Sequence, residues 1–242
     1  MAMDEAECDD MIAACKQHNV KLQIGFMRRF DESYMTAREM VDADEIGDVV
    51  LIKSHTRGPS TPRPWMYDIR KSNGPLAEVN SHDIDTVRWF SGSEFSHVYA
   101  IGGNYRCPDA RAEFPDFYDN VLVTGTFVNG MQGCIDGAQG CAYGYDAETE
   151  VLGTRGVIRV GRSQDKFITA CSKDGMERTP YMSTWRKLFR DASLEEDMHF
   201  VECIRKDKQP RVTGVDGKMA VRVVNAGNIS IIEKRIVRLN EE

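Results

Sequence analysis

The hydrophobic positions near the amino terminus follow two different periods. Residues 4–18 carry apolar side chains at helical spacing, and acidic residues crowd the first turns, where the helix dipole favours negative charge. Residues 20–26, VKLQIGF, alternate between apolar and polar positions and predict a short strand. A helix followed directly by a strand is typical of the end of a βαβ unit, which needs parallel strands beside it. We therefore expect the chain to open in the middle of such a unit.

The next pattern is again helical and then extended. A helix is predicted over 31–44, where Asp31 can cap the first turn. Residues 48–58 predict a strand that runs into a proline-rich loop, and a helix follows from about Asn80 to Phe90. Two further helices, at roughly 183–206 and 215–234, close the chain.

Between these helices the period changes to that of strands. The predicted strands are 96–105, 119–130, 131–140, 146–156, 157–161 and 166–172. Asn129-Gly130 is a hairpin signal, and GTRG at 153–156 is another tight connection. Consecutive strands joined by short turns are antiparallel, so we expect this part to form a meander.

These elements predict an α+β fold, an open and mostly antiparallel sheet with helices on one face. The other face of such a sheet must be solvated or paired with another subunit. We therefore expect a homo-oligomer that forms through the sheet face.

Composition narrows the class of protein. Hydrophobic residues make up 41% of the 242 residues and charged residues 29%, an ordinary globular balance. The net charge of −7 argues against a nucleic-acid partner, and no apolar run is long enough to span a membrane. The seven cysteines have irregular spacings, which favour free thiols in the cytoplasm over a disulfide framework or a metal site.

The first candidate catalytic residues lie in the segment GPLAEVNSHDIDTVRW, residues 74–89. Glu78 and His82 stand four residues apart, so on one helix they would share a face. A carboxylate beside an imidazole can orient it and favour its protonated form, as a general acid–base pair requires. The alternative is that Ser81, His82 and Asp83 only supply the polar start of a helix.

Other polar and aromatic residues sit where a pocket could use them. His55 ends a predicted strand, and Arg28 follows the carboxyl end of another, where α/β folds place ligands. Tyr145 precedes a strand and suits a sugar-like ligand, whereas Trp185 lies near a helix start. Each of them also has an ordinary structural use, in packing or on the surface.

Four segments occur in the order and spacing of one known group: LQIGFMRRFD (22–31), IGDV (46–49), GPLAEVNSHDIDTVRW (74–89) and YGYDAETEVLGTRGVIRV (143–160). Together with TWRKLF (184–189), they make the chain resemble the glucose–fructose oxidoreductase / inositol dehydrogenase / MocA family. Within it, the chain is most similar to myo-inositol 2-dehydrogenases. Members oxidise a ring or sugar hydroxyl by hydride transfer to NAD or NADP.

The resemblance implies roles for several residues. His82 matches the family's catalytic histidine, and Glu78 stands where the partner aspartate is usual, one methylene longer. Met27, Arg28, His55, Tyr145 and Trp185 would line the site for a polyol or sugar. Ser193 stands where an inositol dehydrogenase would have an aromatic residue.

The resemblance also implies two domains. Residues 1–26 match the last helix and strand of a dinucleotide-binding (Rossmann) domain, and residues 27–242 match the substrate-binding and oligomerisation domain. The family's E-K-P lysine and glycine-rich loop would fall before Met1, so we expect that this chain alone neither binds NAD nor turns over. Three hypotheses stay open: the substrate-binding portion of a dehydrogenase, a cofactor-free sugar-binding or scaffold protein, and an enzyme completed by a separate nucleotide-binding chain.

Overall fold

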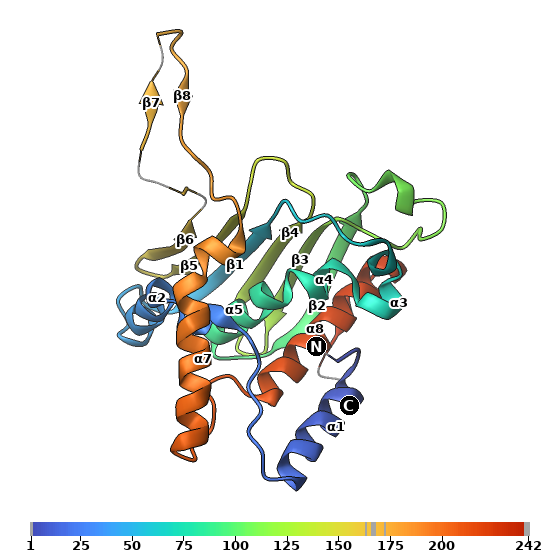
Figure 1. The fold of residues 1–242 in the computed structure, drawn as a ribbon, viewed down its shortest axis with the longest axis vertical. Helices are drawn as coiled ribbons and strands as arrows, with labels where there is room; N and C mark the ends of the chain where they lie inside the picture. Colours follow the sequence, from blue (N-terminus) through green and yellow to red (C-terminus); the bar gives the residue numbers. More distant parts are fainter. Residues whose placement is uncertain (1, 163, 166–167, 172, 240–242) are drawn as a thin grey trace.

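The fold, a computed structural model, is built around one large sheet (Figure 1). The structure describes residues 2–162, 164–165, 168–171 and 173–239. The sheet has the strand order β6-β5-β1-β4-β3-β2-β9. The strands of this sheet are β1 (Val49–Arg57), β2 (Phe95–Gly103), β3 (Asn120–Phe127), β4 (Gln132–Ala138), β5 (Asp146–Gly153), β6 (Val157–Arg162) and β9 (Val237–Arg238).

Helices cover one face of this sheet, as Figure 1 shows. α5 packs on β1 and β4, α8 packs on β2, and α2 packs beside β6. The helices are α1 (Glu5–Gln17), α2 (Glu32–Asp42), α3 (Ile69–Ser72), α4 (Gly74–Glu78), α5 (Ser81–Ser91), α6 (Trp185–Leu188), α7 (Arg190–Arg205) and α8 (Gly214–Glu233), with short 3-10 turns η1 (Met27–Phe30), η2 (Pro64–Tyr67) and η3 (Pro108–Ala110). The predicted α+β class, with a mostly antiparallel sheet, is confirmed.

The expected meander is interrupted by β1. β1 lies between β4 and β5, parallel to β4 and antiparallel to β5. The hairpins β3–β4 and β5–β6 form at the predicted turns, where Phe127 N–H donates to Met131 O (2.8 Å) and Gly153 N–H to Gly156 O (2.9 Å). The expected pairing of β4 with β5 is therefore absent, because each of these two strands pairs with β1 instead.

Three of the predicted elements differ in the structure. Residues 20–26 form no strand; they run as an extended segment in which Ile24 N–H donates to Val212 O (3.2 Å), and no neighbouring strand is described beside them. Of the strand predicted at 166–172, residues 166, 167 and 172 lie outside the described residues, and Ala170–Cys171 (β7) pairs only with Glu177–Arg178 (β8). The helix predicted over 183–206 is divided into α6 and α7 at Phe189.

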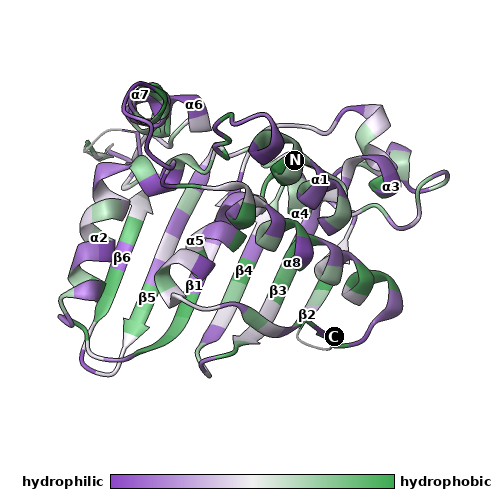
Figure 2. Cartoon of the chain, turned by 90° about the horizontal axis from the view of Figure 1, so that it is seen from below, coloured by the Kyte–Doolittle hydropathy of each residue, from purple (hydrophilic) through white to green (hydrophobic). Residues whose placement is uncertain are grey.

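The two faces of the main sheet differ in what covers them. Side chains toward the helices are buried, for example Ile52, Val98 and Ile135, each 0% exposed. Alternate residues on the open face are exposed, among them Tyr99 and Ile101. Figure 2 shows hydrophobic stretches along β3, β5 and β6. No helix in the described part of the chain has both the length and the apolar character to cross a bilayer.

Candidate functional site

A cavity of about 400 Å³ opens where the end of β1 meets α4, α5, α6 and α7. Pockets that bind small molecules commonly have volumes of this order. Its lining mixes hydroxyl, amide, carboxyl and aromatic side chains. The side chains and glycines that form it are Gly25, Met27, Thr56, Gly58, Ser60, Glu78, Val79, His82, Ala138, Gln139, Tyr145, Trp185, Ser193 and Glu196.

Glu78 and His82 both line this cavity, but they do not share one helix. Glu78 is the last residue of α4, and His82 is the second residue of α5. Between them, Asn80 Nδ2 donates to Asp83 Oδ2 (2.9 Å) and to the backbone oxygen of Asp136 (3.3 Å). These side-chain bonds compete with continuous helix geometry, so the prediction of a shared helix face was wrong.

The His82 imidazole packs against an aromatic ring and is largely shielded from water. Its ring meets Phe26 edge-on with centroids 5.8 Å apart, and its Nδ1 is buried without a hydrogen-bond partner. Burial, reinforced by the positive charge of Arg28, lowers the pKa of His82 to about 4. The sequence suggested that a carboxylate would favour the protonated ring, but desolvation outweighs that effect here. At neutral pH the imidazole is uncharged and able to accept a proton.

Arg28 lies beneath the cavity rather than in its lining. The residue is 1% exposed, and its guanidinium donates to Asp83 Oδ1 (2.9 Å), Ser54 Oγ (3.1 Å) and Thr56 Oγ1 (2.5 Å). Burial opposes this charge, but the Asp83 carboxylate outweighs burial and raises the pKa of Arg28. Asp83 is therefore half of a buried ion pair, and its place near the start of a helix is not its main role.

His55 lies on the opposite side of the sheet from the cavity. Side chains alternate along β1, so Thr56 faces the cavity while His55 Nε2 bonds Asp146 Oδ1 (3.0 Å) on the open face. The geometry thus places Thr56 where the sequence had suggested His55. Among the described residues, His55, Asp146 and Glu148 have ligand atoms within 4.8 Å of one another. Arg57 lies 3.6 Å from Asp146, a positive charge that competes with any cation there.

The remaining sequence candidates meet in the cavity. Met27, Tyr145 and Trp185 line it beside Ser193. Burial raises the pKa of Tyr145 to about 12, so its hydroxyl stays protonated at neutral pH.

Sequence reasoning missed Gln139 and Glu196. Glu196 had a usable signal, because its spacing from the buried Ala192 and Cys203 places it on the packed face of α7.

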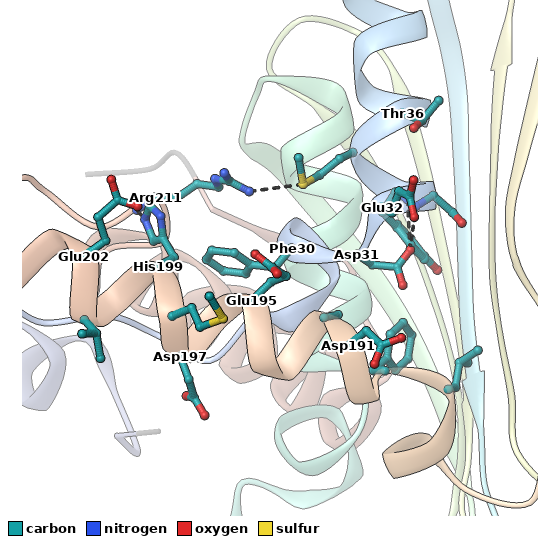
Figure 3. A pocket seen from close by; sticks show the side chains of 18 of the residues that line it. Phe30, Asp31, Glu32, Thr36, Asp191, Glu195, Asp197, His199, Glu202 and Arg211 are labelled. Atoms are coloured by element: carbon teal, nitrogen blue, oxygen red, sulfur yellow. Dashed lines mark hydrogen bonds between the residues drawn. The ribbon is translucent and has the colours of Figure 1, made fainter.

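A larger groove of about 1760 Å³ runs between α2 and α7 (Figure 3). It is open, and several carboxylates line it, including Asp191, Asp197 and Glu202. Its histidine, His199, already accepts a hydrogen bond from the backbone N–H of Arg211 (3.0 Å). The smaller cavity, in contrast, contains buried polar atoms without partners, so it is the better candidate for ligand chemistry.

The binding of NAD or NADP by this chain stays a question for experiment, and the local geometry gives one relevant observation. No glycine-rich turn joins a strand to a helix N-terminus among them, which is the arrangement that receives a pyrophosphate. We therefore assign no residue here to NAD or NADP.

Comparison with known proteins decides the family. The profile of the GFO/IDH/MocA C-terminal domain matches residues 34–159. The chain belongs to the GFO/IDH/MocA family. It is 32% identical to the myo-inositol 2-dehydrogenase of Thermotoga maritima over 241 residues, which cover 100% of this chain and 71% of that protein.

Two other proteins similar to this chain are scyllo-inositol dehydrogenases. The scyllo-inositol 2-dehydrogenase (NAD(+)) of Bacillus subtilis is 32% identical over 86% of this chain and 59% of its own length. The structure of scyllo-inositol dehydrogenase from Lactobacillus casei with bound NAD(H) and scyllo-inositol superposes with a TM-score of 0.86, at 28% identity, over 98% of this chain and 71% of that chain. The chain thus spans 59% to 71% of the length of these three family members.

Proposed function

We propose that this chain is the substrate-binding part of an NAD(P)-dependent dehydrogenase that oxidises a hydroxyl of a cyclic polyol. In this proposal residues 27–242 form the substrate-binding and oligomerisation domain, and residues 1–26 belong to a dinucleotide-binding unit. The observation that carries the proposal is the cavity that brings Glu78 and His82 together with Thr56 and Gln139. The names of the inositol dehydrogenase relatives support the same substrate class.

The cavity supplies the groups that such a reaction needs on the substrate side. An uncharged imidazole with an unpartnered Nδ1 can accept the proton of a hydroxyl as it is oxidised. Glu78 supplies a carboxylate to the same space, and Tyr145 and Trp185 offer apolar surfaces for a ring. In this class of reaction the nicotinamide accepts the hydride.

We also propose that the chain forms a homo-oligomer through the open face of the sheet, in the cytoplasm. Apolar side chains are exposed on several strands of that face, and exposed apolar surface commonly marks interfaces. They are Tyr99, Ile101, Leu122, Leu152 and Val157. The free thiols among the described residues fit a reducing compartment.

The function is tested by titrating the chain with myo-inositol and scyllo-inositol, using calorimetry and ligand-observed NMR. We expect both methods to detect binding, and His82→Ala to weaken it by about tenfold or more, because a hydrogen bond to a buried group is lost. His55→Ala is the matched control and should leave the affinity unchanged, since His55 faces away. Absence of polyol binding to the wild-type chain, or equal effects of the two variants, would count against the proposal.

A further inference from the structure

One carboxyl group in the cavity has no place in the chemistry described so far. Glu196, on α7, lines the cavity opposite the α4–α5 junction. Its Oε1 is buried and accepts no hydrogen bond. Among the described residues, Gln23 Nε2 donates to the backbone oxygen of Glu196 (3.0 Å), and this bond leaves the carboxyl Oε1 without a partner.

The position of Glu196 is fixed by its surroundings. Ala192 and Cys203, 3% and 1% exposed, lie on the same face of α7 and anchor that face to the rest of the chain. The carboxyl lies close to Gly25, where an added Cβ would stand 3.8 Å from Oε2. A larger residue at position 25 would therefore narrow this end of the cavity.

The charged form of a partly buried carboxyl without a hydrogen-bond partner is unfavourable. Burial, with a smaller contribution from the charge of Asp197, raises the pKa of Glu196 to about 7. Within the described part of the chain, no lysine or arginine forms an ion pair with it. A buried polar atom without a partner is often satisfied by a ligand.

We propose that Glu196 is a specificity-determining residue whose carboxylate accepts a hydrogen bond from one hydroxyl of the bound polyol. This assignment rests on the proposed function, because it presumes that the cavity binds a polyol. Glu196 would recognise a different hydroxyl from the one that meets His82, and it would select among polyols by the position of that hydroxyl. A carboxylate that accepts such a bond is a stronger acceptor than the neutral acid.

The charge state of Glu196 gives the proposal a pH signature. Polyol affinity should increase as the pH rises from about 6 to about 8, because the carboxylate form replaces the acid in that interval. The other titratable groups that face this space are Asp197 on α7, and Glu78, His82 and Tyr145 across the cavity. His82, with a pKa of about 4, and Tyr145, with a pKa of about 12, do not change charge in this interval.

The test compares Glu196→Gln with Glu195→Gln, its exposed neighbour on α7. Calorimetry measures the affinity of each variant for scyllo-inositol, for myo-inositol and for singly deoxygenated inositols. We expect Glu196→Gln to weaken binding of the parent polyols by about tenfold, to abolish the pH dependence, and to cause no further loss for the analogue that lacks the contacted hydroxyl. Glu195→Gln should bind like the wild type.

Each outcome decides a different point. If Glu196→Gln binds every polyol as the wild type does, the inference is overturned and the proposed function stands. Equal weakening for all analogues would overturn it too, since that indicates a structural role; a thermal unfolding curve of the variant shows any loss of folding. If the variant does not fold, an affinity of the wild type that stays constant from pH 6 to 8 overturns it. Failure of the wild type to bind any polyol removes the proposed function and this inference together.

Discussion

Strand β1 contributes polar side chains to both faces of the sheet, and the charged groups that they contact are buried on one face and solvated on the other. Toward the helices, Ser54 and Thr56 accept hydrogen bonds from Arg28, whose ion pair with Asp83 has side chains 2% and 0% exposed. Toward the open face, Lys53 pairs with Glu150, with side chains 53% and 26% exposed. The same strand therefore belongs to a buried polar network on one side and to a solvated one on the other.

The difference teaches what each network can do. Exposed pairs are screened by water and contribute little to stability. A buried pair costs desolvation when it forms, but loss of one partner leaves the other charge stranded. The buried network thus holds the floor of the cavity in one arrangement. On the open face, a charged side chain can leave its present partner and pair with a group of another molecule.

The largest expected effect comes from breaking the buried pair. Arg28→Met should lower the free energy of unfolding by about 3–5 kcal/mol, because Asp83 is left buried without its partner. Urea denaturation at pH 7 measures the change. Arg57→Met is the control from the open face, where the pair with Asp136 is partly exposed, and should cost at most about 1 kcal/mol. Equal losses in the two variants would erase the contrast between the faces.

A smaller effect should follow the protonation of His82. The unfolded chain takes up this proton near the ordinary pKa of 6.5, but the folded chain takes it up only near 4, so stability is lost as the pH falls between these values. The loss amounts to about 2–3 kcal/mol. His82→Gln lacks this contribution, so the wild type should lose more stability than the variant between pH 7 and pH 4. A difference between the two that is independent of pH would show that His82 is not buried in its neutral form.

The smallest effect on folding is expected from the open face. Ile101→Lys places a charge on the exposed apolar surface. Because this side chain is exposed in the single chain, the free energy of unfolding should change by no more than about 0.5 kcal/mol. It should also shift the molecular mass measured by light scattering from the oligomer to the monomer. If the wild type is already monomeric, or the variant keeps the wild-type mass, the proposed interface is wrong.

The local part of the fold could be predicted from the sequence, and the non-local part could not. Helix α8 begins where Thr213 and Asp216 cap each other, and the hairpin at Gly130 depends on a positive φ; both signals lie within a few residues. The position of β1 depends on partners far along the chain, which no periodicity reveals. Residues 20–26 alternate like a strand, but a strand also requires a neighbour.

In the candidate site too, the sequence predicts the residues with local signals and misses those that depend on distant contacts. Glu78 and His82 could be singled out because a short motif contains both, and both line the cavity. His55 and Thr56 could not be told apart, since Val49, Val50, Leu51 and Ile52 are all apolar and leave the phase of the alternation open. Nothing local distinguishes the buried Arg28 from an ordinary surface arginine, because its burial depends on Asp83, a residue of another helix.

The place of β1 between β4 and β5 also bears on how the chain folds. The pairing of Leu51 with Gln132 and of Val49 with Gly153 closes very long loops, whereas β2, β3 and β5 each pair with the next strand along the chain. Contacts of long sequence separation form late, since the entropy of loop closure must be overcome first. Thr56 therefore reaches the cavity only after β4 and β5 have been synthesised, and an incomplete chain on the ribosome exposes β1 with both of its edges unpaired.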